Sequence, residues 1–201
     1  MADVLIRDAV AADAEALAEV CIMAGHGVMQ LLYEGLLPGK SLTDIIIARR
    51  LLNLESFAAL PRWRVVTDLG GEVLGGLNSF PHEVLMNALA DPLIDAPRLA
   101  PIAALSELEA TATQTYFVNV IAIFPSARGT GAGYALMQEA ERLARAQNFR
   151  RMALGTFGGD EKLISFYRRQ GFEVVATRPM APHPIFETDG DWALMQRELR
   201  D

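Results

Sequence analysis

Several features that would place this chain in a specialised class of protein are missing from it. Cysteine occurs once in the 201 residues, at Cys21, so no disulfide can form within the chain. No group of cysteines and histidines has the spacing of zinc ligands, and we expect no metal site. Charged residues or prolines interrupt every apolar run before it reaches the ~20 residues that a membrane helix needs. We therefore expect a cytoplasmic protein with no membrane partner.

The chain also lacks the positive charge that nucleic-acid binding requires. Its 25 acidic residues outnumber its 18 basic residues, and the formal net charge of −7 repels polyanions. Near the start, Asp3, Arg7 and Asp8 leave no unbroken apolar stretch of the kind a signal peptide contains. Apolar residues make up 51% of the chain, a globular composition, and its length favours a single domain over residues 1–201.

Hydrophobic periodicity divides the chain into strands and helices. Apolar and β-branched runs predict strands over residues 4–7, 63–67, 73–78, 116–124, 151–156, 172–177 and 192–199. Helical spacing predicts helices over residues 13–25, 132–146 and 160–170, and one within 26–62 whose apolar stripe runs from Leu42 to Leu52. Ser41 and Asp44 form a capping-box-like start for that helix, and turns are expected at 68–71 and Asp189-Gly190. This order of elements predicts an α/β (α+β) fold.

The region from residue 80 to 115 interrupts the regular pattern. Four prolines divide it into a short helix around 83–89 and another around 102–109. Because the region is too apolar to remain disordered, we interpret it as a helical insert that packs over one end of the sheet. Its apolar surface leaves formation of a homodimer open.

A glycine-rich turn joins the expected strand at 116–124 to the helix at 132–146. Gly129, Gly131 and Gly133 allow the backbone to fold tightly, so that N–H groups and the helix dipole converge on one anion, and Arg128 adds a charge. The turn lacks the Lys-Ser/Thr of a P-loop and the spacing of a dinucleotide-binding loop. A phosphate-sized site is therefore indicated, with a tight connection that binds nothing as the alternative.

Two motifs resemble those of the GNAT superfamily of acetyl-CoA-dependent N-acetyltransferases. Arg128, Gly131 and Gly133 match its central signature, Arg/Gln-x-x-Gly-x-Gly/Ala, and the segment from Phe166-Tyr167 to Gly171-Phe172 matches a later one. The resemblance is specific over residues 116–172. It implies a mixed, mostly antiparallel sheet of about six to seven strands flanked by helices, with a V-shaped splay between the fourth and fifth strands.

The resemblance also implies a site for acetyl-CoA as the acyl donor. The pyrophosphate would bind main-chain amides of the glycine turn, at Arg128, Gly129, Thr130, Gly131, Ala132 and Gly133. The pantetheine arm would lie along the fourth strand, at Ile121, Ala122 and Ile123, with the N–H of Val120 or Ile121 facing the thioester carbonyl. Phe166 and Asp160 would complete the site, although Asp160 replaces a common asparagine of relatives and is itself a sound N-cap.

The same resemblance assigns catalytic roles. Tyr167 would protonate the departing CoA thiolate, and Asn119, on the strand that faces the cleft, would hold a water or the substrate amine. No base is identified: His82 and Glu83 are the nearest candidates by topology, but surface roles are favoured for both. Cys21, far in sequence from these residues, gives no support for an acyl-enzyme.

The implied activity is direct transfer of an acetyl group from acetyl-CoA to a primary amine of a small molecule or, alternatively, of a protein. A CoA-binding sensor or scaffold without turnover is the main alternative, and a nucleotide-phosphate binder is a further one. The acceptor itself carries no recognisable motif.

Overall fold

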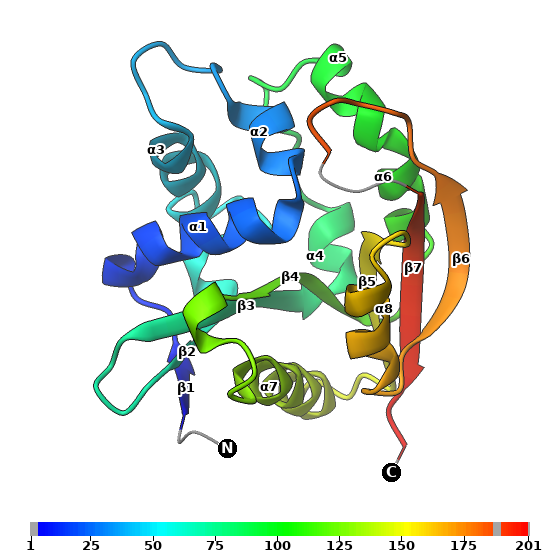
Figure 1. The fold of residues 1–201 in the computed structure, drawn as a ribbon. Helices are drawn as coiled ribbons and strands as arrows, with labels where there is room; N and C mark the ends of the chain where they lie inside the picture. Colours follow the sequence, from blue (N-terminus) through cyan, green and yellow to red (C-terminus); the bar gives the residue numbers. More distant parts are fainter. Residues whose placement is uncertain (1–3, 187–189, 201) are drawn as a thin grey trace.

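The computed structural model describes residues 4–186 and 190–200, and a seven-stranded sheet lies at its centre (Figure 1). The strands are β1 (Leu5–Asp8), β2 (Trp63–Thr67), β3 (Val73–Pro81), β4 (Tyr116–Ile123), β5 (Arg151–Phe157), β6 (Glu173–Pro179) and β7 (Asp191–Glu198). They are ordered β1-β2-β3-β4-β5-β7-β6, and only β4 and β5 run parallel to each other. This confirms the expected mixed, mostly antiparallel sheet.

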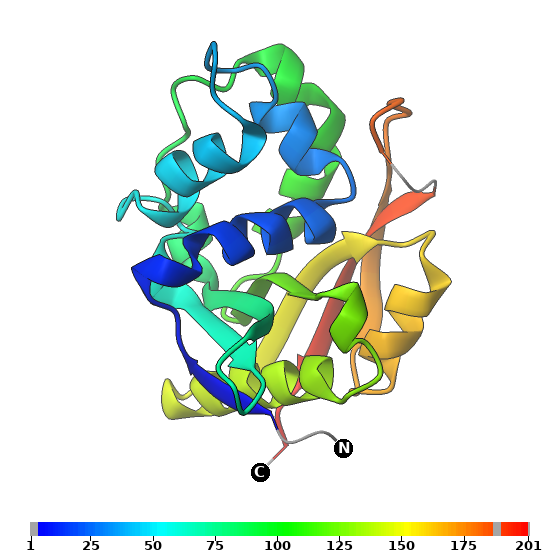
Figure 2. The same cartoon turned by 60° about the vertical axis from the view of Figure 1, so that its left-hand side comes forward.

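Helices cover both faces of the sheet, as Figures 1 and 2 show. The helices are α1 (Ala14–Gly25), α2 (Val28–Tyr33), α3 (Leu42–Ile46), α4 (His82–Met86), α5 (Ala96–Leu99), α6 (Ala103–Ala110), α7 (Ala132–Ala146) and α8 (Glu161–Arg168). Because side chains alternate along a strand, Val65 packs in the core beneath α1–α3 while its neighbour Val66 packs in the core beneath α7. Among the described residues, no helix is both long and apolar enough to cross a bilayer.

Local sequence signals account for many element ends. The Ser41 hydroxyl accepts a 3.1 Å hydrogen bond from the Asp44 N–H, and the Asp44 carboxylate accepts one of 3.2 Å from the Ser41 N–H. The predicted capping box is therefore confirmed. Gly171, shortly after the end of α8, adopts a φ of 83°, as expected for a left-handed glycine that stops a helix. The predicted turn at Asp189-Gly190 includes Asp189, which lies outside the described residues.

The prediction for residues 26–62 was wrong in two respects. A separate buried helix, α2, precedes α3, and Leu52 is 52% exposed rather than part of the apolar stripe. The Leu52 N–H bonds the carbonyl of Ile47, five residues back, which closes the π-helical turn η2 (Ile47–Leu51). This wider turn rotates Leu52 out of line with Ile45 and Ile46.

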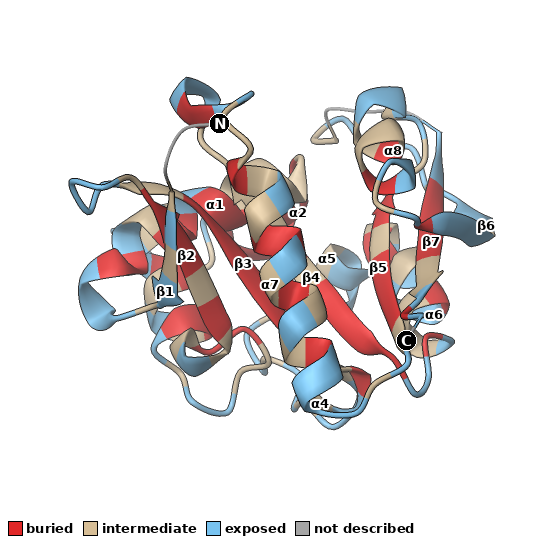
Figure 3. Ribbon diagram, turned by 90° about the horizontal axis from the view of Figure 1, so that it is seen from below, coloured by how far each residue is buried: buried red, intermediate tan, exposed pale blue. Residues whose placement is uncertain are grey.

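Strands β4 and β5 separate after two residue pairs. Only Tyr116 with Met152 and Phe117 with Ala153 are in register, and beyond them the two strands run apart (Figure 3). The V-shaped splay between the fourth and fifth strands is thus confirmed. On its other edge, β4 stays paired with β3 through Ile123. The rest of β4 therefore has an edge without a strand partner on the side facing β5.

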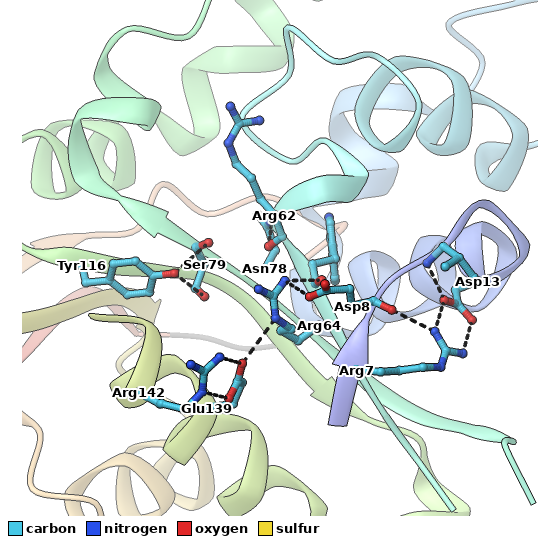
Figure 4. A network of polar contacts seen from close by, with 12 residues as sticks. Arg7, Asp8, Asp13, Arg62, Arg64, Asn78, Ser79, Tyr116, Glu139 and Arg142 are labelled. Atoms are coloured by element: carbon cyan, nitrogen blue, oxygen red, sulfur yellow. Dashed lines mark hydrogen bonds and ion pairs between the residues drawn. The ribbon is translucent and has the colours of Figure 1, made fainter. Parts of the chain in front are cut away.

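Ion pairs hold the neighbouring helices to the sheet (Figure 4). Arg64 of β2 pairs with Glu139 of α7 at 3.3 Å, and Arg142 pairs with the same carboxylate at 2.7 Å. Arg7 of β1 donates two hydrogen bonds, of 2.7 and 2.8 Å, to Asp13 at the start of α1. The helical insert packs through α6 against β5, β7 and β6, so its expected place over one end of the sheet is confirmed.

Candidate active site

The unpaired edge of β4 presents main-chain hydrogen-bonding groups. The Phe124 N–H bonds the Leu74 carbonyl at 2.9 Å, where β3 and β4 meet at the end of β4. Because bonded and non-bonded residues alternate along an antiparallel ladder, Ala122 and Val120 also direct their backbone groups toward β3. Ile121 and Ile123 direct theirs toward the open edge. Of the two amides considered for the thioester carbonyl, the ladder favours that of Ile121.

The glycine turn follows directly from this edge. Gly129 and Gly131 have φ values of 80° and 95°, which favour glycine, and Gly131 is the N-cap of the 15-residue α7. The Thr130 hydroxyl donates a 2.8 Å hydrogen bond to the Ala127 carbonyl and thereby braces the turn. Arg128 is exposed and has no ion pair with any residue that the structure describes. The Ala132 N–H donates a 3.4 Å hydrogen bond to the Thr130 hydroxyl, whereas the charge of Arg128 and the following first-turn amides of α7 are available to an anion.

Helix α8 completes the wall beside the turn. A Cβ atom at Gly133 would lie 3.5 Å from both the Ile123 and the Phe166 side chains, so the turn, β4 and α8 meet at this glycine. Asp160 is the N-cap of α8, and its carboxylate accepts a 3.0 Å hydrogen bond from the Leu163 N–H. The structure therefore brings together the residues expected to bind the cofactor, with a structural role for Asp160.

Tyr167 lies on α8 in the core between the helix and the sheet. Its ring packs edge-on against Phe166 and Phe172, with centroids 5.3 and 6.1 Å away, and the residue is 5% exposed. Burial, with a smaller contribution from Asp160, raises the pKa of the phenol well above its ordinary value of 10. Tyr167 therefore remains protonated at physiological pH, as a proton donor must. Its hydroxyl makes no hydrogen bond within the described part of the chain.

A cavity of about 850 Å³ lies on the opposite side of the splay from Tyr167. Its walls come from α1, α2, η2 and the helical insert, and its floor comes from Asn119 and Val120 of β4 and from Gly155, Thr156 and Phe157 of β5. Tyr167 does not line it. The cavity thus reaches the place where β4 and β5 separate. Its volume is within the range of small-molecule sites.

Asn119 occupies a bulge in β4 at this floor. Val120 pairs with Asn78 and Val118 with Ser79, so Asn119 is the extra residue between them. Its side-chain amide donates a 2.8 Å hydrogen bond to the Asn78 side-chain oxygen, and the Asn78 amide donates one of 3.1 Å to the Arg62 carbonyl. The Asn119 side-chain oxygen makes no hydrogen bond to another described residue. It is therefore available as an acceptor.

Glu109 of α6 is a charged cavity residue that was not predicted from the sequence. Its carboxylate lies against β5, because a Cβ atom on Gly155 would come within 2.7 Å of its Oε1. Burial raises the pKa of Glu109 to about 7, and the positive charge of Arg50 opposes that rise. One signal could have identified it: Glu109 follows Ile102 and Leu105 at helical spacing, which places a carboxylate on an apolar face.

The structure separates the two base candidates named from the sequence. Glu83 is exposed and does not line the cavity, in accord with a surface role. The expectation for His82 was wrong: it is 2% exposed, and its Nε2 donates a 2.8 Å hydrogen bond to the Glu109 carbonyl. His82 therefore anchors the end of α6 that carries Glu109.

Cys21 also lies in a place that its sequence position did not indicate. It lines the cavity from α1 and is 1% exposed. Burial raises the pKa of its thiol to about 11, against a lowering effect of Arg50. Since the thiolate is the nucleophilic form, Cys21 is a poor nucleophile at neutral pH.

Comparisons with known proteins agree with this geometry. A family model described as "Acetyltransferase (GNAT) family" matches residues 48–172. The structure of a GCN5-related N-acetyltransferase from Kribbella flavida is 21% identical, with a TM-score of 0.60 over 98% of each chain. An N-acetyltransferase from Staphylococcus aureus Mu50 is 18% identical, with a TM-score of 0.66 over 96% of this chain and 99% of that one.

A third solved structure is a polyamine N-acetyltransferase of Drosophila melanogaster, which forms N-acetylagmatine. It is 12% identical, with a TM-score of 0.66 over 98% of this chain and 100% of that one. No curated protein sequence matches the chain. At these identities, the structural likeness shows the fold alone.

Proposed function

Because this chain belongs to the GNAT family and is an N-acetyltransferase, we propose that it transfers the acetyl group of acetyl-CoA to the primary amine of a small molecule. The observation that carries the proposal is the splay between β4 and β5. It joins an edge of free main-chain groups and a glycine turn, on one side, to a cavity of about 850 Å³ on the other. Donor and acceptor can therefore meet there.

The residues present fit acetyl-CoA, which would supply the acetyl thioester. Ile121 and Ile123 can bind the amide groups of an extended arm through their backbone, as a neighbouring strand would. The first-turn amides of α7 can bind a diphosphate, and Gly129 leaves room for it, since no atom lies within 4 Å of a Cβ built there. Arg128 adds a positive charge that no described carboxylate neutralises.

The acceptor amine would enter from the cavity and reach the splay beside Asn119. Its ammonium form must lose a proton before the nitrogen can attack. Glu109 is the proposed base, because it lines this cavity and its carboxylate makes no hydrogen bond within the described residues. With a pKa of about 7, it is half ionised at neutral pH and can accept a proton. The Asn119 side-chain oxygen can accept a hydrogen bond from the same amine.

The transfer itself needs two further groups. As the new carbon–nitrogen bond forms, the Ile121 N–H donates to the carbonyl oxygen that gains negative charge. As the carbon–sulfur bond breaks, Tyr167 donates its phenolic proton to the leaving sulfur. The nitrogen then gives up its second proton, which returns through solvent to the Tyr167 oxygen, while Glu109 holds the first proton taken from the ammonium. No acyl-enzyme is required, in keeping with the protonated thiol of Cys21.

An acceptor screen tests this function. The purified protein is incubated with acetyl-CoA and each of a set of amines, and both free thiol and N-acetylated product are quantified. We expect at least one amine to give one thiol for each N-acetyl group formed. Binding of CoA without amine-dependent thiol release would instead support the sensor.

A further inference from the structure

Five charged side chains line the cavity, and they differ in how their charges are balanced. Arg49 is paired with Asp91 through two hydrogen bonds. Glu55 is exposed to solvent. The remaining two, Arg50 and Glu109, have no ion pair with any described residue. The cavity therefore contains one cation and one carboxylate that are buried or half-buried without an ion-pair partner among the described residues.

Arg50 is the more unusual of the two, because arginine is almost never buried unless it is paired. The residue is 6% exposed, and its Nε is buried with no hydrogen-bond partner. Its guanidinium carbon lies 4.8 Å from the centre of the Phe57 ring and 6.0 Å from that of Tyr33. Two aromatic rings thus hold the cation in place, and a hydrogen bond with the Tyr33 side chain helps to raise the pKa of Arg50, whereas its Nε stays without a partner.

Aromatic rings offset only part of the cost of burying a guanidinium, because its N–H donors still need acceptors. Arg49, the adjacent residue on η2, meets this need with Asp91. Arg50 has no such carboxylate within 4 Å in the described chain. A planar guanidinium in this state matches a carboxylate ligand, which it can bind through two parallel hydrogen bonds.

We propose that Arg50 binds a carboxylate of the acceptor, so that the enzyme acetylates small amino carboxylates and not simple amines or polyamines. This inference rests on the proposed function. It places the anionic end of the acceptor at Arg50 and its amine at Glu109 and Asn119. Arg50 of η2 and Glu109 of α6 line the same cavity of about 850 Å³, so one small molecule can reach both.

The remaining cavity wall defines the body of this molecule. The insert contributes Leu85, Leu105 and Ile102, and α2 contributes Val28, Met29 and Leu32. These side chains offer no hydrogen bonds and favour an apolar group. The proposed acceptor class is therefore an amino acid or related amino carboxylate with an apolar body.

Matched pairs of acceptors test the proposal. We would compare kcat/KM for phenylalanine with that for 2-phenylethylamine, and for leucine with that for 3-methylbutylamine. Each pair differs by the carboxylate alone. We expect kcat/KM to be about 10- to 100-fold higher for the amino acid, which is the effect that one charge-assisted hydrogen-bonded pair has on binding. In Arg50→Met, this preference should fall to within about threefold of unity because only the amino acid loses a contact.

Two controls distinguish loss of the carboxylate contact from a structural effect of the Arg50 substitution. Arg49→Met removes the neighbouring arginine, whose charge Asp91 already balances, and should retain the preference. If Arg50→Met does not fold, inhibition of the wild-type enzyme replaces it: 3-phenylpropanoate should compete with the amine at least tenfold better than neutral 3-phenylpropanamide.

The outcomes are distinct. Two results would overturn the carboxylate site while leaving acetyl transfer intact. The first is an equal kcat/KM for the two members of each pair. The second is a fall of kcat/KM in Arg50→Met that is the same for the amino acid and for the matched amine. Equal inhibition by the acid and the amide would do the same. Failure to acetylate any amine, in contrast, would contradict the proposed function itself.

Discussion

The side-chain amide of Asn119 donates a 2.8 Å hydrogen bond to the side-chain oxygen of Asn78, at the point where β4 bulges and β5 turns away from it. Asn78 is fully buried and is held in turn by the Arg62 carbonyl. These bonds set the orientation of the Asn119 amide, and its oxygen is left for a ligand in the cavity.

Replacement of Asn119 by alanine should therefore affect the acceptor more than the donor. We expect KM for the amine to rise about tenfold, the effect of one lost hydrogen bond, while KM for acetyl-CoA changes less than twofold. Steady-state kinetics with each substrate varied in turn measures both values. A larger effect on acetyl-CoA than on the amine would contradict this role.

Tyr167→Phe should lower kcat by about 100-fold or more, because it removes the proposed proton donor to the leaving sulfur. The phenyl ring retains the packing against Phe166 and Phe172, so the fold should persist. Thiol-release kinetics measures kcat, and calorimetry with CoA should give an affinity close to that of the wild type. Full activity in Tyr167→Phe would exclude the hydroxyl from the reaction.

Glu109 predicts a pH dependence. A base must be ionised, so kcat/KM should rise with pH through the Glu109 pKa of about 7. In Glu109→Gln, this rise of kcat/KM near pH 7 should disappear, and kcat/KM above pH 8 should fall by about 100-fold. A second rise of kcat/KM at higher pH, caused by deprotonation of the amine acceptor itself, should remain.

Glu107→Gln is the matched control for Glu109, because it changes an exposed glutamate on the same helix. Its pH profile should equal that of the wild type. If Glu109→Gln retained the rise of kcat/KM near pH 7, another group would have to be the base.

The ion pair between Arg7 and Asp13 predicts a loss of stability in acid (Figure 4). Hydrogen bonds from Arg7 hold the pKa of Asp13 below its ordinary value of 3.8, against the opposing effect of burial. The stabilisation is thus fully present above pH 3.8 and is lost as the pH falls through the lower, folded-state value. Asp13→Asn should lower the free energy of unfolding by about 1–3 kcal/mol at pH 7.

Denaturant unfolding measures this difference, which should shrink as the pH falls below 3.8. Asp8→Asn serves as a comparison, since the Asp8 carboxylate also pairs with an arginine, Arg64, but is 80% exposed. Its loss should cost no more than about 1 kcal/mol. An equal cost for both variants would show that burial of Asp13 adds nothing.

The parts of the fold that could be predicted from sequence depend on local signals. Residues 132–146 were expected to be helical and form α7 with the same bounds. A glycine N-cap and a regular apolar stripe specify that helix within its own segment. The capping box of Ser41 and Asp44 and the left-handed Gly171 are signals of the same local kind.

The acceptor side could not be predicted, because its residues meet only through tertiary packing. Glu109 reaches β5 at Gly155 across 45 intervening positions of sequence, and His82 is buried against Phe117 of β4 and the Glu109 carbonyl of α6. Arg50 could not be identified from the sequence for another reason. Its place within a π-helical turn breaks the 3.6-residue periodicity by which buried positions are identified.

The central claim is that coenzyme A binds the open edge of β4 and the glycine turn, and calorimetric titration with CoA tests it most directly. The wild-type protein should bind CoA at one site per chain, and ATP at the same concentration should bind much more weakly. Arg128→Ala, which changes an exposed residue, should weaken CoA binding by about tenfold without loss of stability. Absence of CoA binding, or equal binding of ATP, would contradict the account.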